Sequence, residues 1–239
     1  VYKVSAIDIN KNHVLYTNEV TMKPYSTSLD SMARHQGEVK QNIKKESSNL
    51  IVNISSDQNS VEFIDKTFES IVRTLINKAG NVPILKDDLI DIVYLDLSHQ
   101  EIETLTDLSL FPSLKNLDIS NTSISDISSI KHLHLLETLS IHHTPITQLG
   151  PISNLKNLIG LNAGDTKISD ISSLSKLTQL QLLILNKTPV LDITPLSTLK
   201  KLETLFLGYT NIDNIDALKT LTKLKTLYIN NTNVNDITG

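Results

Sequence analysis

The sequence predicts an α/β solenoid with a parallel β-sheet on one side, 3₁₀ helices and turns on the convex side, and a small α/β region in front. Three observations predict it. Pairs of aliphatic residues separated by one position recur every 22 residues through residues 89–239. A threonine or a glutamine follows each pair at a constant distance. Residues 1–88 lack this period. We therefore expect an N-terminal capping region or small domain over 1–88 and a repeat domain over 89–239.

The aliphatic pairs define about seven repeats. They are Leu95/Leu97, Leu117/Ile119, Leu139/Ile141, Leu161/Ala163, Leu183/Leu185, Leu205/Leu207 and Leu227/Ile229. Both members of a pair point to the same face of a strand, and each repeat adds one parallel strand about 4.8 Å from the previous one. Only stacked repeats bury a continuous core. We expect Leu139, Leu183 and Leu205 to be buried, and the coil that carries Ala163 to be thinner.

The remaining positions of each repeat predict tight turns. A 22-residue period leaves little room for long helices, and segments such as DISSI (126–130) and DITPL (192–196) contain residues that favour turns. The threonine column begins after Gln100 and comprises Thr122, Thr144, Thr166, Thr188, Thr210 and Thr232. We expect these hydroxyls to face inward and to bond the backbone of the turn, because a buried hydroxyl needs a partner.

Two stretches resemble a known family. NLDISNTSISDISSI (116–130) and LLILNKTPVLDITPL (182–196) are similar to the 22-residue leucine-rich repeats of bacterial internalins and of SDS22-like proteins. The resemblance covers about 150 residues. It implies a non-enzymatic, surface or secreted protein that binds a partner with its concave sheet. Two features depart from the family pattern: threonine stands where such repeats commonly have asparagine, and residues 1–88 do not look like the short helical cap of internalins.

The first 88 residues predict a small α/β unit. Its expected elements are a hairpin of strands 2–9 and 13–22, a helix at 28–45, a strand at 49–54 and a helix at 60–78. The last helix carries an apolar stripe (Ile64, Phe68, Ile71, Val72 and Leu75), with Ser60 as the expected cap and Gly80 as its end. The region either covers the core of the first repeat or forms a separate module with its own ligand.

Composition argues against several classes of function. The 22 basic and 26 acidic residues give a net charge of −4, which does not suit a nucleic-acid binder. There are no cysteines, so disulfides and thiolate metal sites are excluded. No stretch is long and apolar enough for a membrane helix. No phosphate-binding loop, nucleophile elbow or zinc-protease motif is present. We expect no enzyme, no cofactor and no metal site.

Histidines in the repeats occupy one column near the strand ends. His143 and Asp165 fall on adjacent strands, whereas His99 and His143 lie two strands apart, about 9.5 Å by strand spacing. That separation does not suit two ligands of one zinc ion. We interpret the column as solvated polar residues, and we expect His142 to point in a different direction from His143.

The concave face is the predicted binding site. Its outward positions are acidic or small and polar in the first half, with Asp96 and Asp118, and apolar in the second half, with Leu182, Ile184, Phe206, Tyr209 and Tyr228. Exposed apolar clusters mark interaction sites, and aromatic residues are enriched at binding hot spots. The alternative is that this apolar patch packs on a missing C-terminal segment or on a neighbouring molecule in a crystal.

The sequence therefore favours a protein-binding recognition or adhesion protein, exported by a bacterium, with an unidentified protein partner. Three N-x-S/T sequons, at Asn121, Asn186 and Asn230, fall on or beside the concave face, where glycans would obstruct it. A structural spacer of a surface protein and an intracellular SDS22-like scaffold are the alternatives. The predicted repeats lack a C-terminal cap, so we expect a free edge at the last strand, covered by further chain or by a partner.

Overall fold

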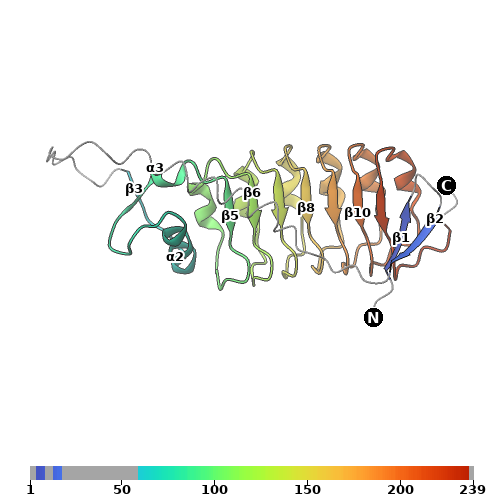
Figure 1. Ribbon diagram of the computed structural model, residues 1–239, viewed down its shortest axis with the longest axis horizontal. Helices are drawn as coiled ribbons and strands as arrows, with labels where there is room; N and C mark the ends of the chain where they lie inside the picture. Colours follow the sequence, from blue (N-terminus) through green and yellow to red (C-terminus); the bar gives the residue numbers. More distant parts are fainter. Residues whose placement is uncertain (1–3, 9–12, 18–58, 237–239) are drawn as a thin grey trace.

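The computed structural model describes residues 4–8, 13–17 and 59–236, with side chains from residue 59 onward. It is an elongated solenoid with a sheet along one side (Figure 1). Seven consecutive parallel strands carry the repeat. They are β5 (Tyr94–Asp96), β6 (Asn116–Asp118), β7 (Thr138–Ser140), β8 (Gly160–Asn162), β9 (Leu182–Ile184), β10 (Thr204–Phe206) and β11 (Thr226–Tyr228). Each strand pairs with the next at an offset of 22 residues, so the predicted fold class and register are confirmed.

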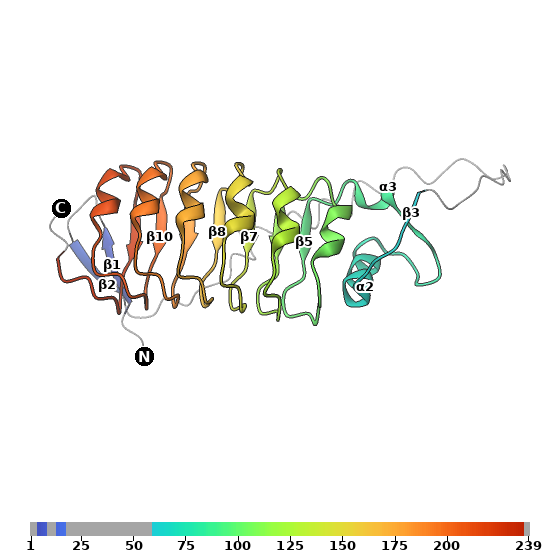
Figure 2. The same cartoon turned by 180° about the vertical axis from the view of Figure 1, so that it is seen from behind.

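The convex side is built from 3₁₀ helices, as the short period predicts (Figure 2). They are η2 (Thr106–Leu110), η3 (Ser128–His132), η4 (Gly150–Asn154), η5 (Ser172–Lys176), η6 (Thr194–Thr198) and η7 (Asp216–Thr220). Asp126 accepts a hydrogen bond from the N–H of Ser128 at 2.8 Å, and Asp192 accepts one from the N–H of Thr194 at 2.8 Å. The hydroxyl of Ser128 adds a second bond, and both lower the pKa of Asp126.

The core lies between the sheet and the 3₁₀ helices. Leu139, Leu183 and Leu205 are 2%, 0% and 0% exposed, which confirms the predicted register. The threonine ladder is also confirmed. The hydroxyls of Thr122, Thr144, Thr166, Thr188, Thr210 and Thr232 each donate to the carbonyl three residues earlier, at 2.6–2.8 Å. These bonds satisfy buried hydroxyls and close the turn after each strand.

A compact unit covers the first repeat. It comprises β3 (Ser60–Val61), α2 (Lys66–Leu75), β4 (Ile84–Leu85) and α3 (Lys86–Leu89). Three aromatic rings join it to the solenoid: Phe68 stacks on Phe111 with centroids 5.7 Å apart, and Phe63 is tilted against both. The unit therefore closes the apolar end of the repeat core, as solenoids require.

The predicted helix at 60–78 is shorter than expected. Ser60 lies in β3, and the cap is Asp65, whose carboxylate accepts the N–H of Phe68 at 3.0 Å. The helix ends at Leu75, with Ile76 as its C-cap. The predicted stripe is only partly buried: Phe68 and Val72 are inside, whereas Ile64 and Leu75 are 66% and 46% exposed.

Two buried carboxylates fasten this unit to the first repeat. Asp107, in η2, accepts the N–H groups of Ile64 and Asp65 at 2.9–3.1 Å. In return Asp65 accepts the N–H groups of Glu103 and Thr104 from the repeat. Burial alone would raise the pKa of Asp65, but the backbone N–H donors around its carboxylate outweigh that effect and lower it. The exchange of bonds holds α2 in one orientation on the solenoid.

The other end of the sheet is closed by the beginning of the chain (Figure 1). β1 (Val4–Asp8) and β2 (His13–Thr17) form the predicted antiparallel hairpin. β1 also pairs antiparallel with β11, with Ala6 opposite Tyr228 and Ile7 opposite Leu227. The prediction of a free edge at the last repeat strand is therefore wrong, because a segment more than 200 residues away in the sequence covers it. The predicted helix at 28–45 and strand at 49–54 lie outside the described residues.

Candidate binding face

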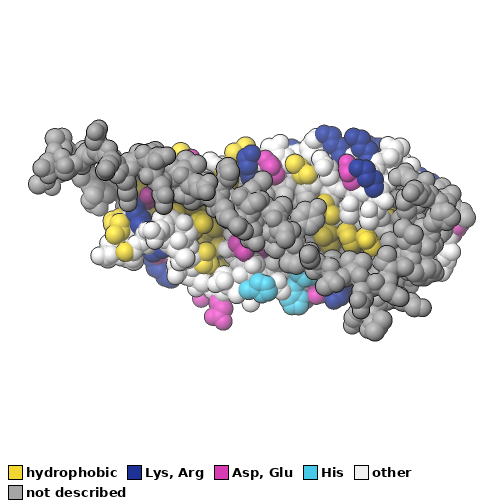
Figure 3. All heavy atoms as spheres, viewed as in Figure 1, with side chains coloured by type: hydrophobic (Ala, Val, Ile, Leu, Met, Phe, Trp, Pro, Cys, Tyr) yellow, Lys and Arg dark blue, Asp and Glu magenta, His cyan; other side chains and the backbone are white. Residues whose placement is uncertain are grey.

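The predicted concave residues gather on neighbouring strands. Ile184, Phe206 and Tyr228 stand side by side in the register of β9, β10 and β11, and Leu182 is two positions before Ile184. Phe206 and Tyr228 stack with ring centroids 4.3 Å apart and an angle of 12° between planes. All four side chains are partly exposed. Figure 3 looks onto the sheet and shows hydrophobic side chains over the region of these strands.

Tyr209 lies beside this group rather than within the strands. It occupies the turn after β10, is 42% exposed and has a φ of 59°. The same turn position has a φ between 53° and 60° in every repeat, and is occupied by His99, Asn121, His143, Asp165, Lys187, Tyr209 and Asn231. This left-handed backbone geometry is uncommon for residues other than glycine. It is therefore set by the repeat, and Tyr209 projects from a defined turn.

Asp96 and Asp118 form the acidic end of the face. They are opposite one another in the pairing of β5 with β6. In each, one carboxylate oxygen accepts the N–H of the residue two positions later, Ser98 at 2.9 Å and Ser120 at 2.8 Å. The hydroxyl of Ser120 donates to the same oxygen of Asp118. The carboxylates are thereby oriented by the ends of their own strands.

These bonds reveal a structural role for this outward column. On β8, Asn162 accepts the N–H of Gly164 at 3.2 Å, which is the bond that Asp96 and Asp118 make on their strands. Ile184, Phe206 and Tyr228 occupy the same column but have no oxygen that could accept such a bond in that position. Phe206 and Tyr228 instead stack on each other, and Ile184, Phe206 and Tyr228 stay partly exposed.

A gap separates the two halves. Gly160 on β8 stands between Thr138 on β7 and Leu182 on β9. A Cβ atom placed on Gly160 would meet only the methyl group of Thr138, at 3.7 Å. The absent side chain leaves room on the sheet surface at this point.

Histidines line the edge of the face where the strands end. His143 Nδ1 lies 2.9 Å from an oxygen of Asp165 on the adjacent turn, as the register predicts, and this bond lowers the pKa of Asp165. His142 Nδ1 instead lies 2.9 Å from the carbonyl oxygen of Gly164, so the two histidines point differently. His99 pairs with Asn121. No group of three or more His, Asp or Glu residues in the described part of the chain is placed to hold a metal ion.

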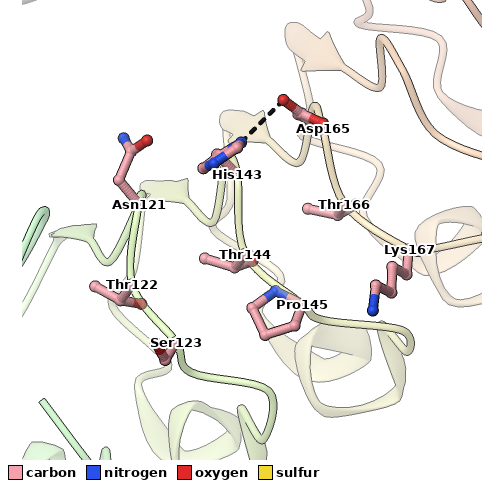
Figure 4. A pocket seen from close by; sticks show the side chains of 9 residues that line it. All are labelled: Asn121, Thr122, Ser123, His143, Thr144, Pro145, Asp165, Thr166 and Lys167. Atoms are coloured by element: carbon pink, nitrogen blue, oxygen red, sulfur yellow. Dashed lines mark hydrogen bonds and ion pairs between the residues drawn. The ribbon is translucent and has the colours of Figure 1, made fainter. Parts of the chain in front are cut away.

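A shallow hollow of about 530 Å³ opens beside this edge (Figure 4). Its lining residues are Asn121, Thr122, Ser123, His143, Thr144, Pro145, Asp165, Thr166 and Lys167. The three threonines are buried and already bonded to the backbone, and His143 is bonded to Asp165. The hollow therefore follows from the stacking of successive turns.

Over residues 59–236 and the two N-terminal strands, no helix is long and apolar enough to span a membrane.

Comparison with known proteins agrees with this geometry. The family model described as leucine-rich repeats (two copies) matches residues 112–155 and 200–239. Among solved structures, the chain is similar to internalin C2 of Listeria monocytogenes, with 27% identity, a TM-score of 0.66, and coverage of 73% of this chain and 87% of that one. It is also similar to internalin InlF of Listeria monocytogenes, with 25% identity, a TM-score of 0.65 and coverage of 73% of this chain. This is a leucine-rich-repeat protein of the bacterial, internalin-like type.

The internalin-like chain spans 58% of the length of InlF. A leucine-rich-repeat protein of Leptospira interrogans, 20% identical with a TM-score of 0.57 over 62% of this chain and 40% of that one, shares the repeat fold. A search of curated proteins finds no match. The likeness covers the repeat architecture.

Proposed function

We propose that this internalin-like protein is a non-enzymatic recognition protein that binds a protein partner on its concave face. The contact centres on Leu182, Ile184, Phe206, Tyr209 and Tyr228. Asp96 and Asp118 orient the partner from the other end of the sheet. An exported location, on a bacterial surface or secreted, belongs to the same proposal and is supported by the likeness to internalins.

One observation carries the proposal. Ile184, Phe206 and Tyr228 occupy the column in which Asp96, Asp118 and Asn162 hold the N–H two residues later. Apolar side chains in that column leave the N–H without this acceptor and stay partly exposed to water. Both effects cost folding free energy. A stacked aromatic pair at solvent-facing positions is therefore better explained by a partner than by the stability of the solenoid.

Photo-crosslinking tests the proposal. Benzoylphenylalanine replaces Phe206 in one variant and Leu191 in a matched control, because Leu191 is an apolar side chain that is 58% exposed outside the concave strands. Both are incubated with solubilised surface proteins of candidate target cells and with bacterial envelope extract. We expect an adduct of defined mass from position 206 only. An excess of the protein without benzoylphenylalanine should abolish formation of the adduct. An excess of the Phe206→Ala/Tyr228→Ala variant should not abolish it.

The affinity of the captured partner gives the second measurement. Phe206→Ala should weaken binding by about 2 kcal/mol, roughly thirtyfold, while Leu191→Ala leaves it unchanged. Equal adducts from both positions, or an affinity unaffected by the double variant, would contradict a concave binding site. That result would favour the spacer alternative, in which the solenoid holds another domain away from a surface.

A further inference from the structure

Acidic side chains lie on β5 and β6, whereas lysines lie beside β10 and β11. We infer that the protein partner of the concave face is a segment with an apolar anchor, a basic group on the β5–β6 side and an acidic group on the β11 side. This inference rests on the proposed function. It adds the chemistry of the partner and the direction in which the partner lies across the strands.

The β5–β6 end offers carboxylate oxygens to a basic group. Asp96 and Asp118 lie on paired positions of adjacent strands, about 4.8 Å apart by strand spacing. One oxygen of each is bound by its own turn, which fixes the carboxylate in place. Within residues 59–236, neither carboxylate forms an ion pair with a lysine or arginine. Two fixed carboxylates on one surface therefore remain for a cationic partner group.

The β11 end offers lysines. Lys201 lies in the segment before β10, and Lys223 and Lys225 lie in the segment before β11, along the edge where these strands begin. We call this group the lysine edge. Glu203 pairs with Lys225 at 2.7 Å, so one carboxylate offsets three positive charges. In Figure 3, basic side chains gather along the upper border of the sheet near the apolar patch, and acidic side chains appear on the sheet toward the other end.

The spacing sets the size of the segment. Five strand steps separate β6 from β11, which is about 24 Å. A helix of about 16 residues or an extended segment of about 7 residues covers that distance. Gly160 lies two strands from β6, where one partner side chain can enter the gap between Thr138 and Leu182.

Charge also fixes the direction. With its basic group over Asp96 and Asp118, the segment gains complementary contacts at both ends. In the reversed direction, acidic groups would face the two carboxylates and basic groups would face the lysine edge. Like charges placed together across an interface suppress wrong binding modes. The apolar anchor of the segment contributes the same affinity in either direction, so its charged groups determine the direction in which it binds.

A selection of random peptides tests the inference. The probe is a phage-displayed library of random 16-residue peptides, selected on the full chain. We expect enriched peptides to carry Lys or Arg on one side of an aromatic or aliphatic group and Asp or Glu on the other. The tightest peptide is then synthesised with a fluorophore, and its Kd is measured by anisotropy.

Charge exchange between peptide and protein gives the decisive comparison. Asp96→Lys with Asp118→Lys, or Lys201→Glu with Lys223→Glu, should each raise the Kd about tenfold or more. The protein carrying all four changes should prefer a peptide with inverted charges. Asp213→Lys with Lys131→Glu, at exposed positions outside the face, is the matched control and should leave the Kd unchanged. Thermal melting of each variant verifies folding.

The outcomes separate the two proposals. If Phe206→Ala raises the Kd of the peptides but neither pair of charge changes alters it, the inferred charge arrangement of the partner is wrong and the proposed function stands. If Phe206→Ala also leaves the Kd unchanged, both the inferred charge arrangement and the proposed function are wrong. The same holds if no peptide is enriched, because a face with this composition should capture complementary segments.

Discussion

Replacing Asp65 with alanine should loosen the N-terminal unit from the solenoid. Asp65 is 6% exposed and caps α2 through the N–H of Phe68, while its second oxygen accepts two N–H groups of the first repeat. Loss of a helix cap costs about 1 kcal/mol. Loss of the charged acceptor for two partly buried N–H groups adds about 1 kcal/mol for each. We expect a total near 3 kcal/mol, concentrated at this junction.

Hydrogen exchange measured by mass spectrometry gives the test. Since each repeat contacts mainly its neighbours, the effect should stay local. Peptides that contain Phe68 or Glu103 should exchange about 100-fold faster in Asp65→Ala, which is the factor expected for about 3 kcal/mol. Peptides from β9 to β11 should keep their rates. Unchanged exchange at the junction, or equal acceleration along the whole solenoid, would refute the reasoning.

The same junction predicts a dependence on pH. The pKa of Asp65 is lowered in the folded protein, so its ionised form stabilises the junction above the unfolded value of about 3.9. The stabilisation of the junction by ionised Asp65 should be lost as the pH falls through the pKa that Asp65 has in the folded protein. Junction exchange in the wild-type protein should therefore accelerate in acid beyond the intrinsic pH effect. Asp65→Asn, which cannot ionise, should not show the excess.

Three further predictions concern stability and self-association. Leu183→Ala should lower the free energy of unfolding in urea by about 2 to 5 kcal/mol, whereas Leu135→Ala, at a 47% exposed position, should change it by less than about 0.5 kcal/mol; equal effects would contradict the packing. Thr188→Val should cost about 1 to 2 kcal/mol in the same assay, and Thr232→Val, only half-buried, less. Deletion of residues 1–17 should uncover β11 and produce dimers in light-scattering chromatography at high concentration; an unchanged monomer with unchanged stability would count against the hairpin as an edge cover.

The repeat could be predicted because its decisive contacts recur at one spacing. A buried leucine pair and a threonine that bonds three residues back are visible as columns in the sequence. The N-terminal elements carry no such repetition. Ser60 and Asp65 are both acceptable helix caps, and the choice of Asp65 depends on bonds to residues about 40 positions away. Local signals alone could not select between them.

The pairing of β1 with β11 was beyond sequence analysis for a related reason. The sequence predicts the hairpin, because a turn and two strands are local, but nothing local indicates which edge the hairpin joins. The candidate site could also be predicted only in part. The 22-residue period predicts that Ile184 and Phe206 occupy equivalent positions of their strands. The hydrogen bond that Asn162 accepts at the equivalent position is visible only in the structure, which places the N–H of Gly164 beside it.

The side chains of the proposed binding site and those of the core alternate along each strand, so the proposed site can be tested separately from stability. Each strand is held by bonds to its neighbours, so the side chains of Phe206 and Tyr228 are positioned before any partner arrives. Little conformational entropy is then lost on binding. Their rings point away from the core, while Leu205 and Leu227 on the same strands point into it. A change at Phe206 should therefore reduce affinity without lowering the melting temperature, and a change at Leu205 should do the reverse. If the apolar patch instead packs on a further segment of the chain, a change at Phe206 should lower the melting temperature as well.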